Sequence, residues 1–330
     1  MVHTNAIATL RGWERAPICN IPTPLRELDR LATHLGVGRA YAKMDAETGF
    51  ALGGNKVRKL EFELAPSRIE GVSCVLTAGG PQSNHCRVTA AYAARLGLRC
   101  VLIVNGPEPE RPTGNALLHR LFGAEIVIAD DRDARTATMH AVAETIRAEG
   151  GSPLVVPIGA STGLGCLGYA LAACELTEQL DALADGGWET LLFVPSSSCG
   201  TLGGLVLGLA LLGRSDVRLF GISADVPARE LRAETLRIAS AGAELLGAEA
   251  DLAAVDLTTI DRQVGAGYGI PTEASDAATE TFGRLEGIIL DPTYTAKAAA
   301  EMIEWVAANR LEGHQRLVFL HTGGAPGLLA

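Results

Sequence analysis

The sequence predicts an α/β protein of two units, each built on a parallel open sheet that helices cover on both faces. First, short continuous apolar runs alternate with helix-length segments from about residue 72 onward, which is typical of parallel strands buried on both faces. Second, 38 glycines and only 5% aromatic residues suit many tight turns between strands and helices. Third, 330 residues are enough for about two domains.

A first series of elements precedes residue 160. We expect an N-terminal arm up to about Arg39 that contains a short helix, Leu25–Leu35, followed by a short strand, Ala40–Met44. A helix that begins near Asn55 comes next. The remaining runs predict strands and helices in alternation, namely strands Val72–Ala78, Cys100–Val104, Glu125–Ile128 and Leu154–Pro157 and helices Asn84–Leu96, Thr113–Phe122 and Asp133–Glu149.

A second series follows a glycine-rich stretch, Gly159–Gly168, which is a candidate hinge between the two units. The patterns predict helices Tyr169–Leu183, Leu202–Leu212, Pro227–Leu246, Thr272–Glu286 and Thr293–Asn309 and strands Thr190–Val194, Arg218–Ser223, Gly287–Leu290 and Leu317–His321. In such a fold a ligand binds in the crevice at the carboxyl ends of the strands.

Charge and composition argue against several classes of protein. The net charge is −10 and the basic residues are scattered, so a nucleic-acid-binding surface is not expected. The first twenty residues contain Arg11, Glu14 and Arg15 and no apolar core of a secretory signal. No uncharged apolar run approaches the roughly 18 residues of a membrane helix. We therefore expect a cytoplasmic protein without a membrane segment.

The cysteines and histidines do not predict a metal site. Seven dispersed cysteines without a Cys-x-x-Cys pair indicate reduced thiols. No pair of histidines has metal-ligand spacing, and four of them are expected to be surface or capping residues, namely His85, His119, His140 and His314.

The stretch from Gly53 to Leu60 holds an unusual helix start. Val57, Leu60 and Leu64 form one apolar stripe of a helix for which Asn55 is a favourable N-cap. Its first turn also carries three cations, which the helix macrodipole disfavours, namely Lys56, Arg58 and Lys59. Lys56 and Lys59 share a face. Such a start is either a solvated basic helix end or a site that meets an anion, and a lysine there loses its proton easily.

Two strand-to-helix turns could bind anions through free backbone N–H groups. The first runs from Gly79 to His85 and adds the side-chain donors of Gln82, Ser83 and Asn84; it suits a carboxylate, although an ordinary helix cap is the alternative. The second runs from Pro195 to Gly204 and is rich in hydroxyls without the lysine of a P-loop. It suits a phosphate, or else serves as a cap with close packing at its glycines.

A third group of candidates lies late in the chain. Tyr268 stands between two glycines, Tyr294 begins a helix after a strand, and Thr322 ends a strand and could offer its hydroxyl to a ring nitrogen. Each could also be an ordinary turn or core residue, and for Tyr294 the local pattern alone favours the core.

Together, these segments resemble the D-cysteine desulfhydrase and 1-aminocyclopropane-1-carboxylate deaminase family. The resemblance runs in register from about Pro22 to Gly327 through the motifs GGNKVRKLEFE, QSNHCR, GYGIP, DPTYTAKA and HTGG. It implies a two-domain fold type II pyridoxal-phosphate (PLP) enzyme, similar to the tryptophan synthase β subunit. The implied domains are a large PLP-binding domain, residues 1–55 and 166–330, and a small domain, residues 56–165. A homodimer and an amino-acid substrate are also implied.

The resemblance assigns a role to each candidate. Lys56 would bond the cofactor covalently, Lys59 would lie near its phosphate, and Asn84 would bond the pyridoxal 3′-oxygen. Tyr294 would flank the ring and Thr322 would face the pyridine nitrogen. The phosphate would be held by the loop of Ser198, Cys199, Gly200, Thr201, Leu202 and Gly203. Gln82, Ser83 and Asn84 would bind the substrate, Tyr268 would lie over it, and the catalytic residues would be Lys56, Ser83, Tyr268 and Tyr294.

Two departures from the family pattern bear on the reaction. Cys199 and Leu202 replace the usual glycine and the His or Gln of the phosphate loop, which leaves side-chain contacts there open. Thr295 stands where the deaminases resemble one another in having a glutamate, so Thr322 alone would serve the ring nitrogen. A hydroxyl cannot keep a pyridinium protonated, which makes the ring a weaker electron sink.

A weaker sink suits early departure of a β-substituent. We therefore expect α,β-elimination from a β-substituted amino acid, with D-cysteine giving pyruvate, ammonia and hydrogen sulfide. An L-cysteate sulpho-lyase, a β-replacement enzyme, an aminocyclopropane-carboxylate deaminase and a low-turnover PLP- or amino-acid-binding protein remain alternatives.

Overall fold

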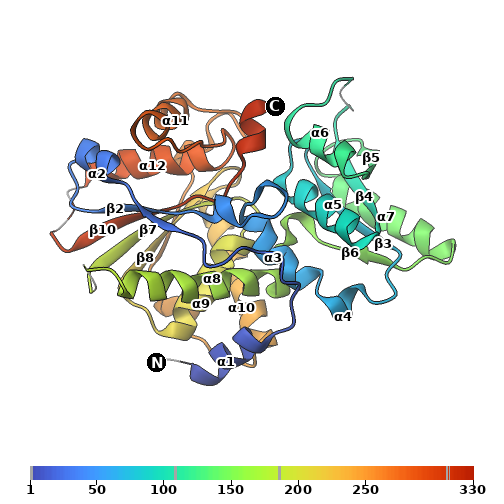
Figure 1. Cartoon of the computed structure of the whole chain (residues 1–330), viewed down its shortest axis with the longest axis horizontal. Helices are drawn as coiled ribbons and strands as arrows, with labels where there is room; N and C mark the ends of the chain where they lie inside the picture. The colour runs from blue at the N-terminus through green and yellow to red at the C-terminus, as the bar shows by residue number, and fades with distance from the viewer. Residues whose placement is uncertain (1–2, 108–109, 185–186, 310, 312) are drawn as a thin grey trace.

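The strands of the computed structural model, which describes residues 3–107, 110–184, 187–309, 311 and 313–330, form two separate sheets. One has six strands in the order β1-β2-β10-β7-β8-β9 and the other four in the order β5-β4-β3-β6. All neighbouring strands are parallel except β1 and β2, which pair antiparallel. Figure 1 shows a larger and a smaller lobe, and the predicted class of two covered, largely parallel sheets is confirmed.

The larger sheet is covered on both faces, as its alternating buried residues require. Its strands are β1 (Leu25–Glu27), β2 (Ala40–Lys43), β7 (Glu189–Ser196), β8 (Val217–Ser223), β9 (Leu257–Ile260) and β10 (Gln315–Leu320). Leu192 and Val194 face a core shared with α1 (Thr4–Gly12), α8 (Gly163–Asp181), α9 (Gly200–Leu212) and α10 (Ala228–Leu245). Leu191 and Phe193 face the opposite core, under α2 (Asp29–Leu35), α11 (Glu273–Glu286) and α12 (Thr295–Ala308) (Figure 1).

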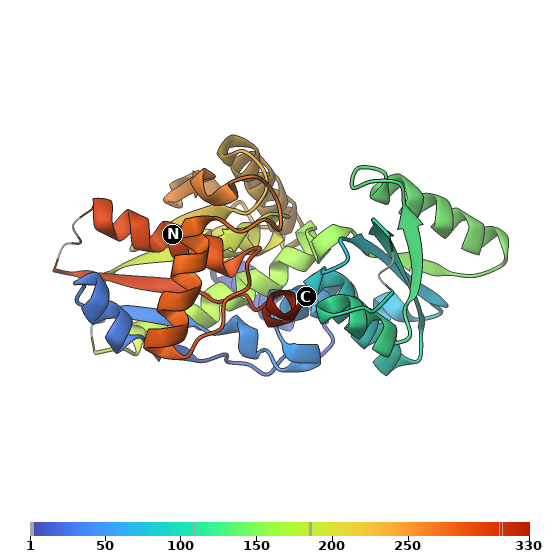
Figure 2. The ribbon, with the colours of Figure 1, turned by 90° about the horizontal axis from the view of Figure 1, so that it is seen from above.

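The smaller sheet follows the same plan. Its strands are β3 (Cys74–Gly79), β4 (Arg99–Asn105), β5 (Glu125–Ala129) and β6 (Pro153–Val155). Helices α5 (Asn84–Leu96) and α6 (Gly114–Leu121) lie on one face and α7 (Arg135–Ala148) on the other, as Figure 2 shows from above. Helix α3 (Asn55–Glu63) packs on the α5 side and also against α8 of the larger unit, and a short α4 (Pro66–Ile69) follows it.

Several predicted elements differ from the structure. Residues 25–27 form β1, because they pair with β2 in the sheet, and only the part from Asp29 onward is helical. Residues 287–290 are not a strand: Gly287 ends α11 with φ +64°, and the segment has no strand pairing. The patterns also missed α1, which lies within the expected arm, and β9, which lies within the stretch between the predicted helices 227–246 and 272–286.

The predicted glycine hinge, Gly159–Gly168, is wrong for residues 163–168, because these residues form the first turns of α8. Their glycines serve close packing. A Cβ at Gly168 would lie 2.2 Å from the carbonyl oxygen of Arg58, and one at Gly165 would lie 2.2 Å from that of Ala160. The absence of a side chain at Gly168 therefore lets α8 approach α3 closely, and its absence at Gly165 lets α8 approach the turn at Ala160.

The two sheets draw their strands from different parts of the chain. Strands of the larger sheet come from residues 25–43 and 189–320, and those of the smaller sheet from residues 74–155. The domain limits at residues 55/56 and 165/166 stay a prediction. Within the described part of the chain, no helix combines the length and the apolar character needed to cross a bilayer.

Candidate active site

The helix that carries Lys56 begins where two chain segments meet. Gly53 and Gly54 turn the backbone into α3 with φ of +65° and +108°. Gly54 takes the N-cap position, so the prediction of Asn55 as N-cap is wrong; Asn55 is the first helical residue. Its backbone N–H donates to the carbonyl oxygen of Thr322 (3.0 Å), and its side-chain amide donates to Thr201 Oγ1 (2.9 Å). Asn55 thus links α3 to the end of β10 and the start of α9.

The apolar stripe and the separate direction of Arg58 are confirmed. Val57 and Leu60 are fully buried between α3 and the small sheet. The Arg58 side chain is buried, and its Nε and Nη groups donate to the carboxylates of Asp45 and Glu175 at 2.9 to 3.0 Å. This network holds the rear of the helix, which leaves Lys56 and Lys59 on the other face.

Both lysines lie in surroundings that favour the neutral amine. Burial lowers the pKa of Lys56 to about 8. Burial, and secondly the charge of Lys56, lower the pKa of Lys59 well below its usual range. Lys59 Nζ is 3.3 Å from Ser161 Oγ. An anion beside Lys59 would restore its charge, and a neutral amine at Lys56 is a nucleophile.

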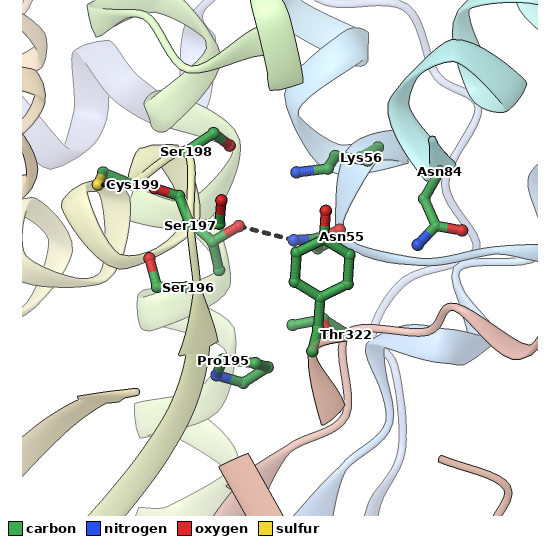
Figure 3. Close-up of a pocket in the computed structure, with 11 residues that line it drawn as sticks. Asn55, Lys56, Asn84, Pro195, Ser196, Ser197, Ser198, Cys199 and Thr322 are labelled. Atoms are coloured by element: carbon green, nitrogen blue, oxygen red, sulfur yellow. Dashed lines mark hydrogen bonds between the residues drawn. The ribbon is translucent and has the colours of Figure 1, made fainter. Parts of the chain in front are cut away.

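Lys56 points toward the loop between β7 and α9 (Figure 3). The cavity between them, which we call the serine cavity, is lined by Asn55, Lys56, Asn84, Pro195, Ser196, Ser197, Ser198, Cys199, Thr201, Tyr294 and Thr322. It therefore gathers candidates from α3, the starts of α5, α9 and α12, and the end of β10. These positions are far apart in sequence, and the fold alone brings them to one place.

The start of α9 has the features of an anion-binding site. No carbonyl of the described residues accepts the backbone N–H of Thr201 or Leu202, and Ser196 Oγ is buried without a hydrogen-bond partner. A Cβ at Gly200 would lie 2.7 Å from Ser161 Oγ and 3.1 Å from Lys59 Nζ. Glycine at 200 therefore keeps the helix start open to a group held by these donors.

Two residues of the serine cavity are held in defined orientations. Asn84 Oδ1 accepts from Arg87 Nη1 (2.9 Å) and Asn115 Nδ2 (2.9 Å), which fixes Asn84 Nδ2 as a donor with no acceptor among the described residues. Thr322 follows His321, whose Nδ1 accepts from the backbone of Gly323 (3.1 Å) and whose Nε2 donates to Ile289 (2.9 Å). Burial also lowers the pKa of His321, so the imidazole that connects Gly323 with Ile289 is neutral.

A second cavity of about 180 Å³, which we call the arginine cavity, adjoins the first. The two share Lys56, Ser197, Ser198 and Tyr294. Its other lining residues come mainly from the carboxyl edge of the small sheet and are Gly79, Gly80, Pro81, Ser83, His85, Asn105, Arg132, Arg135, Ile158, Gly159 and Tyr268. Lys56 thus lies at the boundary of the two cavities and lines both of them.

The start of α5 offers donors to the arginine cavity. Ser83 is the N-cap, and its Oγ accepts from the backbone of Cys86 (3.2 Å). No carbonyl of the described residues accepts the backbone N–H of Asn84 or His85. The Ser83 hydroxyl hydrogen and two N–H groups can therefore meet a carboxylate at this helix start.

Five predicted residues do not line either cavity. Lys59 and Gly200 lie just behind the serine cavity at Ser161, and Leu202 and Gly203 lie deeper in α9, where they pack against Gly221 and Ile238. Gln82 faces the other way: its Nε2 donates to Thr113 O (3.2 Å) and its Oε1 accepts from Asn115 N (2.7 Å). A direct substrate contact of the Gln82 side chain would require it to leave these partners.

The two tyrosines meet at the boundary of the cavities. Their hydroxyl groups are hydrogen-bonded and their rings pack edge to face with centroids 5.8 Å apart, placing Tyr268 beside Tyr294. Burial raises the pKa of both, so both hydroxyls keep their protons. Thr295 does not line the cavities, because its hydroxyl is buried on Asp291 Oδ1 (2.7 Å).

Of the four histidines predicted at the surface or as caps, the structure contradicts the prediction for two. His85 and His119 are both 2% exposed. The Thr77 hydroxyl donates to Val156 O (2.8 Å) and so accepts from His85 Nε2 (2.7 Å), which leaves His85 Nδ1 as a buried acceptor without a partner. His140 and His314 are exposed.

Sequence reasoning missed several lining residues. Asn55, Pro195, Ser196 and Ser197 stood inside the quoted motifs but received no role of their own. Arg132 and Arg135 had no motif at all. Their one signal was a pair of arginines at the start of a predicted helix, where the macrodipole disfavours cations.

The residues present fit pyridoxal phosphate. The open start of α9 with Ser196 and Lys59 suits a phosphate, and Lys56 is a readily deprotonated amine. Asn84 Nδ2 is a donor that suits the ring's 3′-oxygen, and the Thr322 hydroxyl is one that suits the ring nitrogen. No group of three metal-ligating side chains occurs within the described ranges.

Comparison with known proteins agrees with this fit. The family model "Pyridoxal-phosphate dependent enzyme" matches residues 18–323. The D-cysteine desulfhydrase of Salmonella typhi is 38% identical over 326 residues, 97% of each chain. The crystal structure of an ACC deaminase homologue superposes with a TM-score of 0.89 at 32% identity, covering 99% of this chain and 97% of that one. A threonine deaminase from Solanum lycopersicum shares the fold, with a TM-score of 0.67 at 16% identity, covering 98% of this chain and 83% of that one. The chain belongs to the family of pyridoxal-phosphate dependent enzymes.

Proposed function

We propose that this lyase catalyses α,β-elimination from a β-substituted amino acid, with D-cysteine yielding pyruvate, ammonia and hydrogen sulfide. The observation that carries the proposal is the position of Lys56, which lines both the serine cavity and the arginine cavity. A cofactor in the first and an amino acid in the second would meet at its amine. The similarity to D-cysteine desulfhydrases supports the choice of substrate.

Bound pyridoxal phosphate supplies an electron sink for the pair of electrons released when the Cα–H bond breaks. Lys56 is the residue placed to bond the cofactor and, as a neutral amine, to take a proton. Lys59 and the N–H groups of Thr201 and Leu202 would hold the phosphate, and Ser198, Cys199, Gly200 and Gly203 shape the loop. Cys199 takes φ +65°, which turns the chain into α9.

The start of α5 binds and orients the amino acid. Ser83 and the free N–H groups of Asn84 and His85 would hold its carboxylate, and Asn84 Nδ2 would donate to the cofactor 3′-oxygen. Gln82 supports this turn through Thr113 and Asn115. Tyr268 and Tyr294, both protonated, would lie over the substrate and the ring.

Thr322 favours elimination over ring opening. Its hydroxyl can donate to an unprotonated ring nitrogen but cannot protonate it, so carbanion character gains limited stabilisation. Early loss of a β-substituent suits that setting. Ring opening of 1-aminocyclopropane-1-carboxylate, which has no α-proton to remove, does not.

A keto-acid release assay tests the proposal. The holoenzyme is offered D-cysteine, L-cysteine, L-cysteate, β-chloroalanine and 1-aminocyclopropane-1-carboxylate. We expect pyruvate and sulfide from D-cysteine and little 2-oxobutyrate from the cyclopropane. Faster 2-oxobutyrate formation than pyruvate formation would identify a deaminase instead, and no keto acid from any compound would indicate a low-turnover binding protein.

We also propose a homodimer. Four leucines near one groove are unusually exposed, at 64% (Leu52), 49% (Leu117), 71% (Leu121) and 76% (Leu329), and three of them line that groove. A second copy would bury them. Light scattering should give twice 34.4 kDa, falling toward the monomer mass in L117D. A wild-type mass of 34.4 kDa would contradict the dimer.

The cysteines support a proposal of cytoplasmic location. All seven are free and six of them are buried, so the fold uses no disulfide. Labelling with a thiol reagent after denaturation should count seven free thiols in protein purified without reductant.

A further inference from the structure

Two arginines at the start of α7 line the arginine cavity, and the lyase reaction as proposed does not use them. Arg132 precedes the helix and Arg135 is its first residue, where the macrodipole disfavours cations. An acidic residue of that loop, Asp131, is occupied: its Oδ1 accepts from the backbones of Asp133 and Ala134 (2.8 Å each). Asp131 therefore binds the turn that leads into this helix start and offsets part of its dipole, but among the described residues no ion pair joins it to Arg135.

The charge of Arg132, which belongs to the smaller unit, is paired with a carboxylate of the larger unit. Its guanidinium bonds both carboxylate oxygens of Asp225, with Nη1 at 2.9 Å from Oδ1, and it lies 5.0 Å from the centre of the Tyr268 ring. Asp225 Oδ2 also accepts from Ser197 Oγ (3.3 Å). Arg132 thus links the smaller unit to the larger one, and its charge is already paired with the carboxylate of Asp225.

Arg135 is in a different position. Its Nε donates to the carbonyl oxygen of Arg132 (2.8 Å), which fixes the plane of the guanidinium. Within the described residues, no acceptor meets its Nη1 or Nη2 and no carboxylate forms an ion pair with it. The side chain is half-buried, and burial together with Arg132 lowers its pKa. A partly desolvated guanidinium whose Nη1 and Nη2 groups are available as donors suits a planar or tetrahedral oxyanion.

The substrate carboxylate has a separate place. Ser83 and the two free N–H groups at the start of α5 provide its donors, as described above. Arg135 belongs to a neighbouring helix start on the same cavity. Because Ser83 and Arg135 line one cavity of about 180 Å³, a substrate that carries two anionic groups could use both helix starts.

We infer that Arg135 binds an anionic oxyanion group carried on Cβ of the substrate, so that the enzyme accepts β-sulfonated or similarly charged amino acids such as cysteate. This inference rests on the proposed elimination. In the reaction, the Cα–H bond breaks and its proton passes to the protein. The Cβ–S bond breaks with both electrons leaving on sulfite, and water hydrolyses the 2-aminoacrylate to pyruvate and ammonia. No oxidant or reductant is needed.

The experiment compares the wild-type holoenzyme with R135Q and R135K on L-cysteate, D-cysteate, D-cysteine and β-chloroalanine. We expect pyruvate and sulfite in equal amounts from one cysteate enantiomer. R135Q should lower kcat/KM for that enantiomer at least about tenfold, as loss of charged hydrogen bonds does, and change D-cysteine less than about threefold. R135K should retain part of the cysteate activity. R147Q, at the other end of the same helix, is the matched control and should behave as wild type.

Three outcomes would overturn the inference. One is pyruvate from D-cysteine or β-chloroalanine but from neither cysteate, which would leave the lyase function intact. Another is an equal loss in R135Q on every substrate, which would assign Arg135 to the α-carboxylate. If no compound yields keto acid, the lyase proposal fails separately, and calorimetric titration of cysteate decides: equal affinity of wild type and R135Q would overturn the inference, and weaker binding by R135Q would support it.

Discussion

Arg58 holds Asp45 with two parallel hydrogen bonds of 2.9 Å, Nε to Oδ2 and Nη2 to Oδ1, beneath the helix that carries Lys56. Both side chains are almost fully buried. Glu175 and Tyr169 complete the network from α8. Because Arg58 is two residues from Lys56, this pair fixes how the reactive amine is presented, although it does not touch either cavity.

Removal of one member of this pair should be costly. We expect R58M to lower the free energy of unfolding by about 3–5 kcal/mol, because the buried carboxylate of Asp45 loses its main partner. The control R237M breaks an exposed pair with Glu234 and should change stability by less than about 0.5 kcal/mol. Urea unfolding measures both. Equal effects of the two variants would show that the Arg58 network contributes no more than a surface ion pair.

Lys56 and Lys59 should separate in their effects. K56A should abolish turnover and the visible absorbance of the bound cofactor, because no other amine lines the serine cavity among the described residues. K59A should keep the covalent attachment and lose affinity for pyridoxal phosphate, since it removes a cation beside the expected phosphate site at the start of α9. Borohydride reduction followed by peptide mapping checks the assignment, and a pyridoxyl group on any lysine other than Lys56 would refute it.

Capture of pyridoxal phosphate by the apoprotein should depend on pH. The pKa of Lys56 is lowered from 10.5 to about 8, so the neutral amine becomes the major form above that pH. The capture rate should rise up to about tenfold per pH unit below pH ~8 and level off above it. Stopped-flow absorbance measures the rate. A rate that still climbs steeply between pH ~9 and ~10 would mean that Lys56 has an ordinary pKa.

Ser83 should matter for the substrate and not for the cofactor. S83A should keep cofactor binding and lower kcat/KM at least about tenfold, equivalent to roughly 1.4 kcal/mol. The hydroxyl caps α5 and also faces the arginine cavity. S67A removes an exposed hydroxyl outside both cavities and serves as the control. An unchanged kcat/KM in S83A would reduce Ser83 to a helix cap.

Buried His119 should make the fold sensitive to mild acid. Burial lowers its pKa from 6.5 to about 4, so the unfolded chain binds a proton that the folded protein refuses between these values. Stability is therefore lost as the pH falls from ~6.5 toward ~4. Between pH ~7 and ~5 the H119Q variant should lose about 2 kcal/mol less than wild type in urea unfolding. Identical losses would exclude His119 as a contributor.

Local periodicity predicted most of the architecture, because buried parallel strands and long amphipathic helices leave strong patterns. Helix Asn84–Leu96 was predicted with the bounds that the structure has. Elements set by tertiary pairing were not predictable in this way. Residues 25–27 become a strand only because β2 lies beside them, and β9 has four residues at the edge of the sheet.

In the candidate site, too, residues in local motifs were predictable and residues placed by tertiary structure were not. Lys56, Asn84, Tyr294 and Thr322 were identified through motifs, and the structure brings them to one cavity. Arg132 and Arg135 were not, because their one local signal, a pair of arginines at a predicted helix start, does not tell which cavity that helix start lines. Gln82 looked like a substrate donor, but its amide is taken up by Thr113, a partner 31 positions away.

The position of β10 has a consequence for synthesis of the protein. This strand comes late in the chain, yet it lies between β2 and β7 in the middle of the larger sheet. Until it leaves the ribosome, β2 and β7 face each other across a missing strand, and both expose unpaired backbone edges. Thr322 lies two residues after the end of β10, so a nascent chain lacks both the completed sheet and one wall of the cofactor cavity. We therefore expect pyridoxal phosphate to bind only after β10 has been made, and the growing chain to depend on protection of those edges from aggregation.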